Sequence, residues 1–176
     1  MALIDWDNKN WKEKENGDFI FDLANITSKT FDVTAEKWAK VIANADRGVE
    51  KNQLRNFYDK ALELEEKAIN SNEEEFKTKI LPFVKMLNSK VAYAKNKQQG
   101  SVNQAFVEFM NEAIRQIVNK ETFANFKFLF EAIIGFYQKE KIIRNNCDAS
   151  IFFIKQNYEK NCRRENNQNR HHRGRK

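Results

Sequence analysis

The side chains best suited to nucleophilic, acid–base or metal chemistry are few here and lie near the C-terminal end. The two histidines, His171 and His172, are adjacent, and the two cysteines are Cys147 and Cys162. Their spacing matches neither a zinc-ligand pattern nor a disulfide framework. From Asn161 onward the chain has little apolar content, so we expect disorder that cannot hold a histidine beside a nucleophile. The sequence therefore predicts no histidine-based active site, no metal centre and no cofactor.

Machinery for nucleotide hydrolysis or carboxylate catalysis is also missing from the sequence. Gly48 and Gly100 stand alone at expected helix boundaries, without the Gly-Lys-Ser/Thr sequence of a phosphate loop. The carboxylates lie beside lysines or at helix starts, as in the run 73–75, which is typical of solvating charge. We therefore predict a protein that is not an enzyme. A nuclease assay with and without divalent metal would test the enzyme alternative.

Basic residues interleaved with aromatic ones are the remaining candidates for chemistry. Lysine and arginine neutralise phosphates, and aromatic rings stack on bases. Lys51 and Arg55 are one helical turn apart and would project together from the start of a helix. Lys90, Tyr93 and Lys97 share a stripe on the next expected helix. These two faces favour binding of nucleic acid.

Each face also has an ordinary explanation. Arg55 precedes Asp59 by one turn, so the two could form a surface ion pair worth only about 0.3–0.5 kcal/mol. The lysines could simply hydrate an exposed helix. The residues alone thus leave open a structural adaptor that binds only protein through its helical faces.

Most of the net charge is concentrated at the C-terminal end. The 176 residues carry a formal net charge of +6. Residues 163–176 hold six basic side chains and one acidic one, so about five of those charges belong to this segment. A polyanion site in the folded part must therefore arise from the arrangement of charges on one face.

The sequence also bears on the compartment. Asp5 and Asp7 interrupt the apolar residues at the N-terminus, and no run reaches the roughly 18 apolar residues of a membrane span. Two cysteines outside any disulfide framework fit a reducing environment. We expect a cytoplasmic protein with no membrane partner.

Composition and hydrophobic periodicity predict an all-α fold. Five glycines and one proline are too few for the turns of an all-β chain. We expect a compact helical bundle of about five to six helices over residues 34–160. An irregular lead-in of residues 1–33, packing its aromatic residues locally, would precede the bundle, and a basic disordered tail of residues 161–176 would follow it.

Capping residues and apolar spacing predict where the helices begin and end. Pro82 should interrupt the third helix and kink it near Leu81. Residues 123–137 are apolar almost all round, which places this helix in the middle of the bundle. The expected core includes Phe130, Ile133 and Phe136, and the expected helix starts are Thr34, Asn52, Glu73, Ser101 and Thr122, with one more short helix around residues 151–154.

Three motifs, taken in order, resemble features of the small subunit of the type III-A CRISPR effector complex. The first is the capped helix start Asn-Gln-Leu-Arg at residues 52–55. The second is Tyr-Ala-Lys-Asn-Lys at residues 93–97, where the family pattern has Tyr-x-Ala-Gly-Arg. The third is Phe-Glu-Ala-Ile-Ile-Gly-Phe-Tyr at residues 130–137. The resemblance covers about residues 36–141, and Lys97 keeps the charge of the family's arginine without its bidentate fork.

This resemblance implies a non-catalytic, RNA-binding helical subunit of an antiviral ribonucleoprotein. Its implied partners are guide RNA, target RNA, the other effector subunits and further copies of itself. RNA cleavage and second-messenger synthesis would belong to other subunits, and guide base pairing would read the target. The subunit would neutralise phosphates of either strand without reading bases, through Lys51, Arg55, Lys90, Lys97 and Arg115, with Tyr93 beside them.

Overall fold

The computed structural model describes residues 19–45, 49–96 and 100–143. These residues contain helices and no strand, so the all-α prediction is confirmed for the part of the chain that is described. The chain divides into two compact units, Met1–Gln138 and Lys139–Lys176. Helical residues 120–138, here called the C-terminal helix, are the last part of the first unit. Residues 139–143, which belong to the second unit, are also helical. The expected helix around 151–154, the basic tail and Gly48 lie outside the described residues.

The first helical segment begins earlier than the sequence predicts. Residues from 28 onward are helical, and the π-helical segment η1 (Thr30–Thr34) leads directly into α2 (Ala35–Asn44). Thr34 has helical backbone angles and makes no capping hydrogen bond with its side chain, so its prediction as N-cap was wrong. A threonine caps a helix only where its backbone is extended, and here the chain has already turned.

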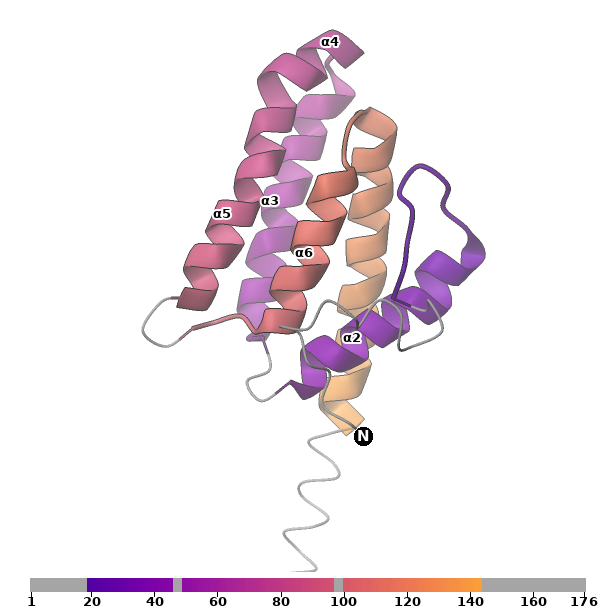
Figure 1. The fold of residues 1–176 in the computed structure, drawn as a ribbon, viewed down its shortest axis with the longest axis vertical. Coiled ribbons are helices and arrows are strands. Elements are labelled where there is room, and N and C mark those ends of the chain that lie inside the picture. Colours follow the sequence, from indigo (N-terminus) through magenta and orange to yellow (C-terminus); the bar gives the residue numbers. More distant parts are fainter. Residues whose placement is uncertain (1–18, 46–48, 97–99, 144–176) are drawn as a thin grey trace, which may run out of the picture. The chain divides into compact units, whose positions relative to one another are not determined.

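A helical hairpin follows, formed by α3 (Lys51–Ile69) and α5 (Leu81–Asn96), which run antiparallel and contact each other (Figure 1). Between them lie one turn, α4 (Glu73–Glu75), and the π-helical segment η2 (Phe76–Ile80). Glu50, with extended backbone, is the N-cap of α3, two residues before Asn52, so the prediction of Asn52 as the cap was wrong. The predicted end of this helix near residue 70 is confirmed.

The run of three glutamates begins a helix, as predicted. The side chain of Asn72 accepts a hydrogen bond from the backbone N–H of Glu75 at 2.9 Å, and the Glu75 carboxylate accepts one from the Asn72 N–H at 3.3 Å. This reciprocal capping box satisfies two N–H groups that would otherwise lack a partner. A local sequence pattern therefore determines this helix start.

The π-helical segment η2 lies immediately before Pro82. Proline has no N–H to donate to the carbonyl of Thr78, and its ring would collide with that carbonyl in a regular α-helix. A wider π turn over Phe76–Ile80 accommodates the ring, and the chain stays helical into α5. The irregularity predicted near Leu81 is therefore a π turn.

Asn103 begins α6 (Gln104–Gln116) and also completes the end of α2. Its Oδ1 accepts a hydrogen bond from the Phe106 N–H at 3.0 Å, and its Nδ2 donates to the carbonyl of Ile42 at 2.7 Å. The predicted cap, Ser101, lies outside the helix, so that prediction was wrong. A buried asparagine is tolerated here because it satisfies polar groups at two helix ends.

The C-terminal helix begins at residue 120, close to the predicted Thr122. The Asn119 Oδ1 accepts a hydrogen bond from the Thr122 N–H at 2.8 Å, and the Thr122 Oγ1 accepts one from the Asn119 N–H at 3.1 Å. Thr122 therefore lies in the first turn and supplies half of a reciprocal cap.

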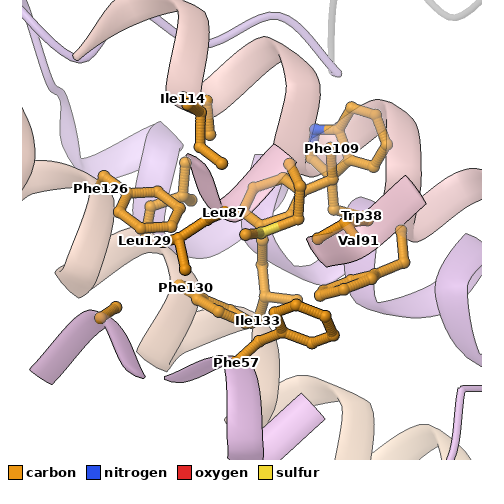
Figure 2. Close-up of a cluster of buried hydrophobic side chains, with 14 of the residues drawn as sticks. Trp38, Phe57, Leu87, Val91, Phe109, Ile114, Phe126, Leu129, Phe130 and Ile133 are labelled. Carbon is orange, nitrogen blue, oxygen red and sulfur yellow. The ribbon is translucent and has the colours of Figure 1, made fainter. Parts of the chain in front are cut away.

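The core is rich in aromatic side chains, and Figure 2 shows them converging from several helices. Phe130 and Ile133 are completely buried, as predicted, whereas Phe136 is only partly buried at the edge of the core. The Phe130 ring lies 5.8 Å from the Phe109 ring of α6. The buried residues of the C-terminal helix are Phe123, Phe126, Leu129, Phe130, Ile133 and Tyr137.

Residues 19–23, here called the lead-in segment, pack against helices far along the chain and not locally as predicted. The Phe19 ring lies 5.2 Å from the Trp38 ring, and the Phe21 ring lies 6.0 Å from the Phe109 ring. Alternate residues of the segment, Phe19, Phe21 and Leu23, are buried. This alternation is that of an extended chain on an apolar surface.

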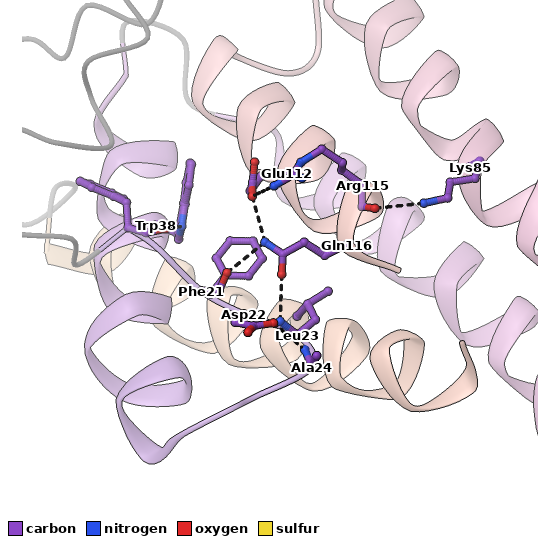
Figure 3. Close-up of polar contacts among 10 residues, drawn as sticks. Phe21, Asp22, Leu23, Ala24, Trp38, Lys85, Glu112, Arg115 and Gln116 are labelled. Carbon is purple, nitrogen blue, oxygen red and sulfur yellow. Dashed lines mark hydrogen bonds and ion pairs between the residues drawn. The ribbon is translucent and has the colours of Figure 1, made fainter. Parts of the chain in front are cut away.

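Side-chain amides hold the backbone of the lead-in segment (Figure 3). The Gln116 Oε1 accepts a hydrogen bond from the Leu23 N–H at 2.8 Å, while the Gln116 Nε2 donates to the Phe21 carbonyl at 2.9 Å. The Asn125 Nδ2 donates to the Leu23 carbonyl at 2.9 Å. These amides satisfy backbone groups that a neighbouring strand would satisfy in a sheet.

Replacing Phe130 by alanine should destabilise the protein by about 3–5 kcal/mol, because the ring is completely buried and its removal leaves a cavity in the core. Denaturant unfolding monitored by circular dichroism would measure this. Phe128→Ala, on the same helix but 48% exposed, is the matched control and should cost much less. Equal losses in the two variants would contradict the central position of Phe130.

Candidate nucleic-acid interface

The start of α3 presents two basic side chains to solvent. Lys51 and Arg55 are both exposed, while Leu54 and Phe57 on the other side of the helix are buried. Within the described part of the chain, Arg55 forms no ion pair with Asp59. The surface pair that would have occupied Arg55 is therefore not formed.

The second predicted face lies on α5. Lys90 is exposed and the Tyr93 side chain is 72% exposed, whereas Val91 and Ala94 point into the core. Lys97, the third residue of this stripe, lies outside the described residues. The structure thus describes two of the three residues and leaves both open to solvent.

The hairpin brings these two faces to the same end of the molecule's first unit. Because α3 and α5 run antiparallel, the first turns of α3 lie beside the last turns of α5 (Figure 1). Lys51 and Arg55 belong to the beginning of α3, and Tyr93 belongs to the end of α5. Residues about forty positions apart in the sequence therefore contribute to one end of the hairpin.

The sequence around α5 has a further feature, an absence of acidic residues, which the three motifs do not include. No aspartate or glutamate occurs between Glu75 and Glu108, a stretch that contains six lysines. Elsewhere in the hairpin, acidic and basic side chains alternate, as in the Lys60–Glu63 ion pair at 3.1 Å. A count of acidic residues in a sliding window would have identified α5 as the more uniformly basic arm.

Several lysines of this stretch have structural partners. Lys79 pairs with Glu75 at 2.9 Å, and Lys95 donates a hydrogen bond to the Gln104 side chain. The Lys85 Nζ donates to the Ile114 carbonyl at 2.5 Å, at the end of α6. Partial burial, followed by the nearby charge of Arg115, lowers the pKa of Lys85. Lys85 therefore acts as a helix cap, whereas the Lys90 side chain is exposed.

Arg115 lies apart from the other predicted contacts. It is in the last turn of α6, where its guanidinium pairs with the Glu112 carboxylate at 2.6 Å (Figure 3). A shallow, open cleft beside it is lined by two carboxylates, Asp22 and Glu112. These negative charges disfavour a polyanion, so the arrangement does not favour Arg115 as a phosphate contact.

Polar contacts with the C-terminal helix fix how α3 is oriented. The Glu65 carboxylate pairs with the Lys127 Nζ at 3.2 Å, with both side chains largely buried. The Tyr58 hydroxyl donates a hydrogen bond to the Glu131 carboxylate at 3.0 Å. Burial, and to a smaller extent this hydrogen bond, raises the pKa of Tyr58 to about 12. These contacts secure one side of α3 and turn Arg55 toward solvent.

The raised pKa of Tyr58 predicts a loss of stability at alkaline pH. The unfolded state ionises near pH 10 and the folded state only near pH 12, so the free energy of unfolding should fall as pH rises through this window. Phenylalanine cannot ionise, so Tyr58→Phe should lose less stability over the same range. Denaturant unfolding of both proteins from pH 9 to pH 11, a range that includes the lower half of this window, gives the slope of unfolding free energy against pH for each protein. Parallel slopes would contradict the prediction.

The described residues contain neither a metal-ligand cluster nor a membrane-spanning helix. In those ranges, no group of three or more His, Cys, Asp or Glu side chains could hold a metal ion. None of the described helices combines the length and the apolar character needed to cross a membrane.

Comparison with known proteins connects the fold to a family. Searches of curated proteins and of solved structures give no match. The family model described as Csm2 Type III-A matches residues 26–142, a range that contains α2 to α6 and the whole C-terminal helix. The match includes the three motifs at residues 52–55, 93–97 and 130–137. The chain therefore belongs to the Csm2 family of type III-A CRISPR effector small subunits.

Proposed function

We propose that this chain is a non-catalytic, RNA-binding subunit that lines the channel for guide and target RNA in its effector complex. The observation that carries the proposal is the exposure of Lys51 and Arg55 on α3 and of Lys90 and Tyr93 on α5, two antiparallel helices that contact each other. Exposed cations without acidic partners are suited to phosphates. Membership of the Csm2 family supports the assignment to a ribonucleoprotein.

The proposed mechanism is electrostatic. Each lysine or arginine that neutralises a phosphate releases a condensed counterion, which favours binding and makes it depend on salt concentration. Contacts of this kind hold a duplex in position without reading its sequence. Target selection would come from base pairing with the guide. The subunit would thus hold a duplex of any sequence.

The proposal includes the partners that such a role requires. These are guide RNA, target RNA, the other subunits of the effector and further copies of the chain, acting in the cytoplasm in antiviral defence. The core supports a scaffold role, because the large apolar side chains on the inner faces of α5 and α6 pack within the first unit. Lys97 and the basic tail would add charge to the same interaction.

Removing two cations from the proposed interface should weaken RNA binding in a way that depends on salt. If Arg55 and Lys90 each neutralise one phosphate, replacing both by alanine should reduce the slope of log affinity against log salt by about 1.4–1.8. The loss should be the same for different RNA sequences. Titration of a guide–target duplex into the assembled complex at several salt concentrations measures the slope.

A matched control removes the same charge from another part of α3. Lys60→Ala combined with Lys67→Ala takes two exposed cations from beside Glu63 and Glu66 and should leave the slope near that of the wild type. Both double variants should keep the wild-type melting temperature, since all four side chains are exposed. An equal slope change in both would mean that only total charge matters. No change in either would favour an adaptor that binds only protein.

A further inference from the structure

The outer face of α5 carries large apolar side chains that the fold does not bury. Phe83 is 54% exposed, Met86 is 46% exposed and Tyr93 is 72% exposed. At 3.6 residues per turn these three side chains and Lys90 lie within about 80° of the helix circumference. They form one continuous stripe, here called the α5 stripe.

Packing within the domain does not explain the α5 stripe. The core takes up the adjoining face of α5, where Val84, Leu87, Val91 and Ala94 are buried. Leaving phenylalanine, methionine and tyrosine side chains together in water forgoes stabilisation of about 25 cal/mol for each Å² of apolar area that remains exposed. Contiguous exposed apolar residues on one helix face usually mark an interaction surface.

The charge around the α5 stripe indicates what the surface binds. Lys90 lies between Met86 and Tyr93, and the chain carries no acidic residue from 76 to 107. The described residues give neither Lys90 nor Tyr93 an ion pair or a side-chain hydrogen bond. The aromatic rings of Phe83 and Tyr93, beside a lysine that has no acidic partner among the described residues, fit a ligand that is both planar and anionic, as a nucleotide is.

We propose that the α5 stripe is a stacking platform for unpaired bases of single-stranded RNA, with Tyr93 contacting a base and Lys90 the adjacent phosphate. This inference rests on the proposed function, because it assigns a second kind of RNA contact to the same helical hairpin. A duplex hides the faces of its bases inside the helix, so the phosphate contacts at Arg55 and the base contacts at Tyr93 recognise different parts of the RNA. The platform accepts any base sequence, since every base has a flat face.

The test separates stacking from phosphate binding by changing the RNA as well as the protein. The full chain is titrated into a single-stranded oligonucleotide containing 2-aminopurine, into the same oligonucleotide with abasic positions, and into a blunt RNA duplex. Tyr93→Ala should weaken binding of the intact single strand by about 5- to 150-fold, the range for loss of one aromatic–base stack. Its affinity for the abasic strand and for the duplex should stay unchanged.

Conservative and matched variants make the result specific. Tyr93→Phe keeps the ring and should retain wild-type affinity together with quenching of the 2-aminopurine fluorescence. Phe128→Ala removes a 48% exposed aromatic ring from another helix and should behave as wild type. Tyr93 is exposed, so its variants should keep the wild-type melting temperature.

Three outcomes would overturn the proposal. Equal losses on intact and abasic strands would make Tyr93 a contact to the RNA backbone. Absence of quenching at saturating protein would exclude stacking. Unchanged RNA affinity with loss of co-purifying effector subunits would identify the α5 stripe as a protein-docking surface. Failure of the proposed function is separate, because it would appear as an unchanged salt slope for the guide–target duplex in the Arg55 and Lys90 double variant, whereas the stacking test changes only Tyr93.

Discussion

The Phe109 ring of α6 is the point at which the separate elements of the domain meet. It lies 5.6 Å from the Trp38 ring of α2 and 5.8 Å from the Phe130 ring of the C-terminal helix. Phe21 of the lead-in segment and Phe126 of the C-terminal helix contact the same ring, at 6.0 Å and 6.4 Å. Such aromatic pairs add about 0.5–1.5 kcal/mol each beyond the burial of their area. The lead-in segment is therefore part of the core.

Polar side chains satisfy helix ends, because the last carbonyl groups of an α-helix have no partner within the helix. Lys85 donates hydrogen bonds to carbonyls at the end of α6, and Lys120 donates one to the Ser71 carbonyl, just after α3, at 2.6 Å. Asn103 does the same for α2. A positive charge at a helix C-terminus also interacts favourably with the helix dipole. Several cations thus support the fold and are not available to a ligand.

Only some of the cations on α3 and α5 are therefore exposed at the candidate interface. In α5, Lys85 and Lys95 have partners within the domain, whereas Lys90 and the Tyr93 ring face solvent. The Glu65–Lys127 ion pair holds α3 so that Arg55 is exposed at the same end of the hairpin. The exposed residues of α3 and α5 are thus kept in place by helix faces that are buried in the core.

The sequence by itself determined the features that depend on short-range chemistry. The capping box at Asn72, the apolar pattern around Phe130 and the family motifs were all readable, because a few adjacent residues create each of them. Only the tertiary structure decided that the Asn103 Nδ2 donates to the Ile42 carbonyl and that the Gln116 amide holds the backbone of the lead-in segment. Whether a polar side chain forms a cap or a hydrogen bond at a given position depends on the backbone angles there and on neighbours from distant segments. Those distant contacts form only when the aromatic core assembles, so local spacing carries no record of them.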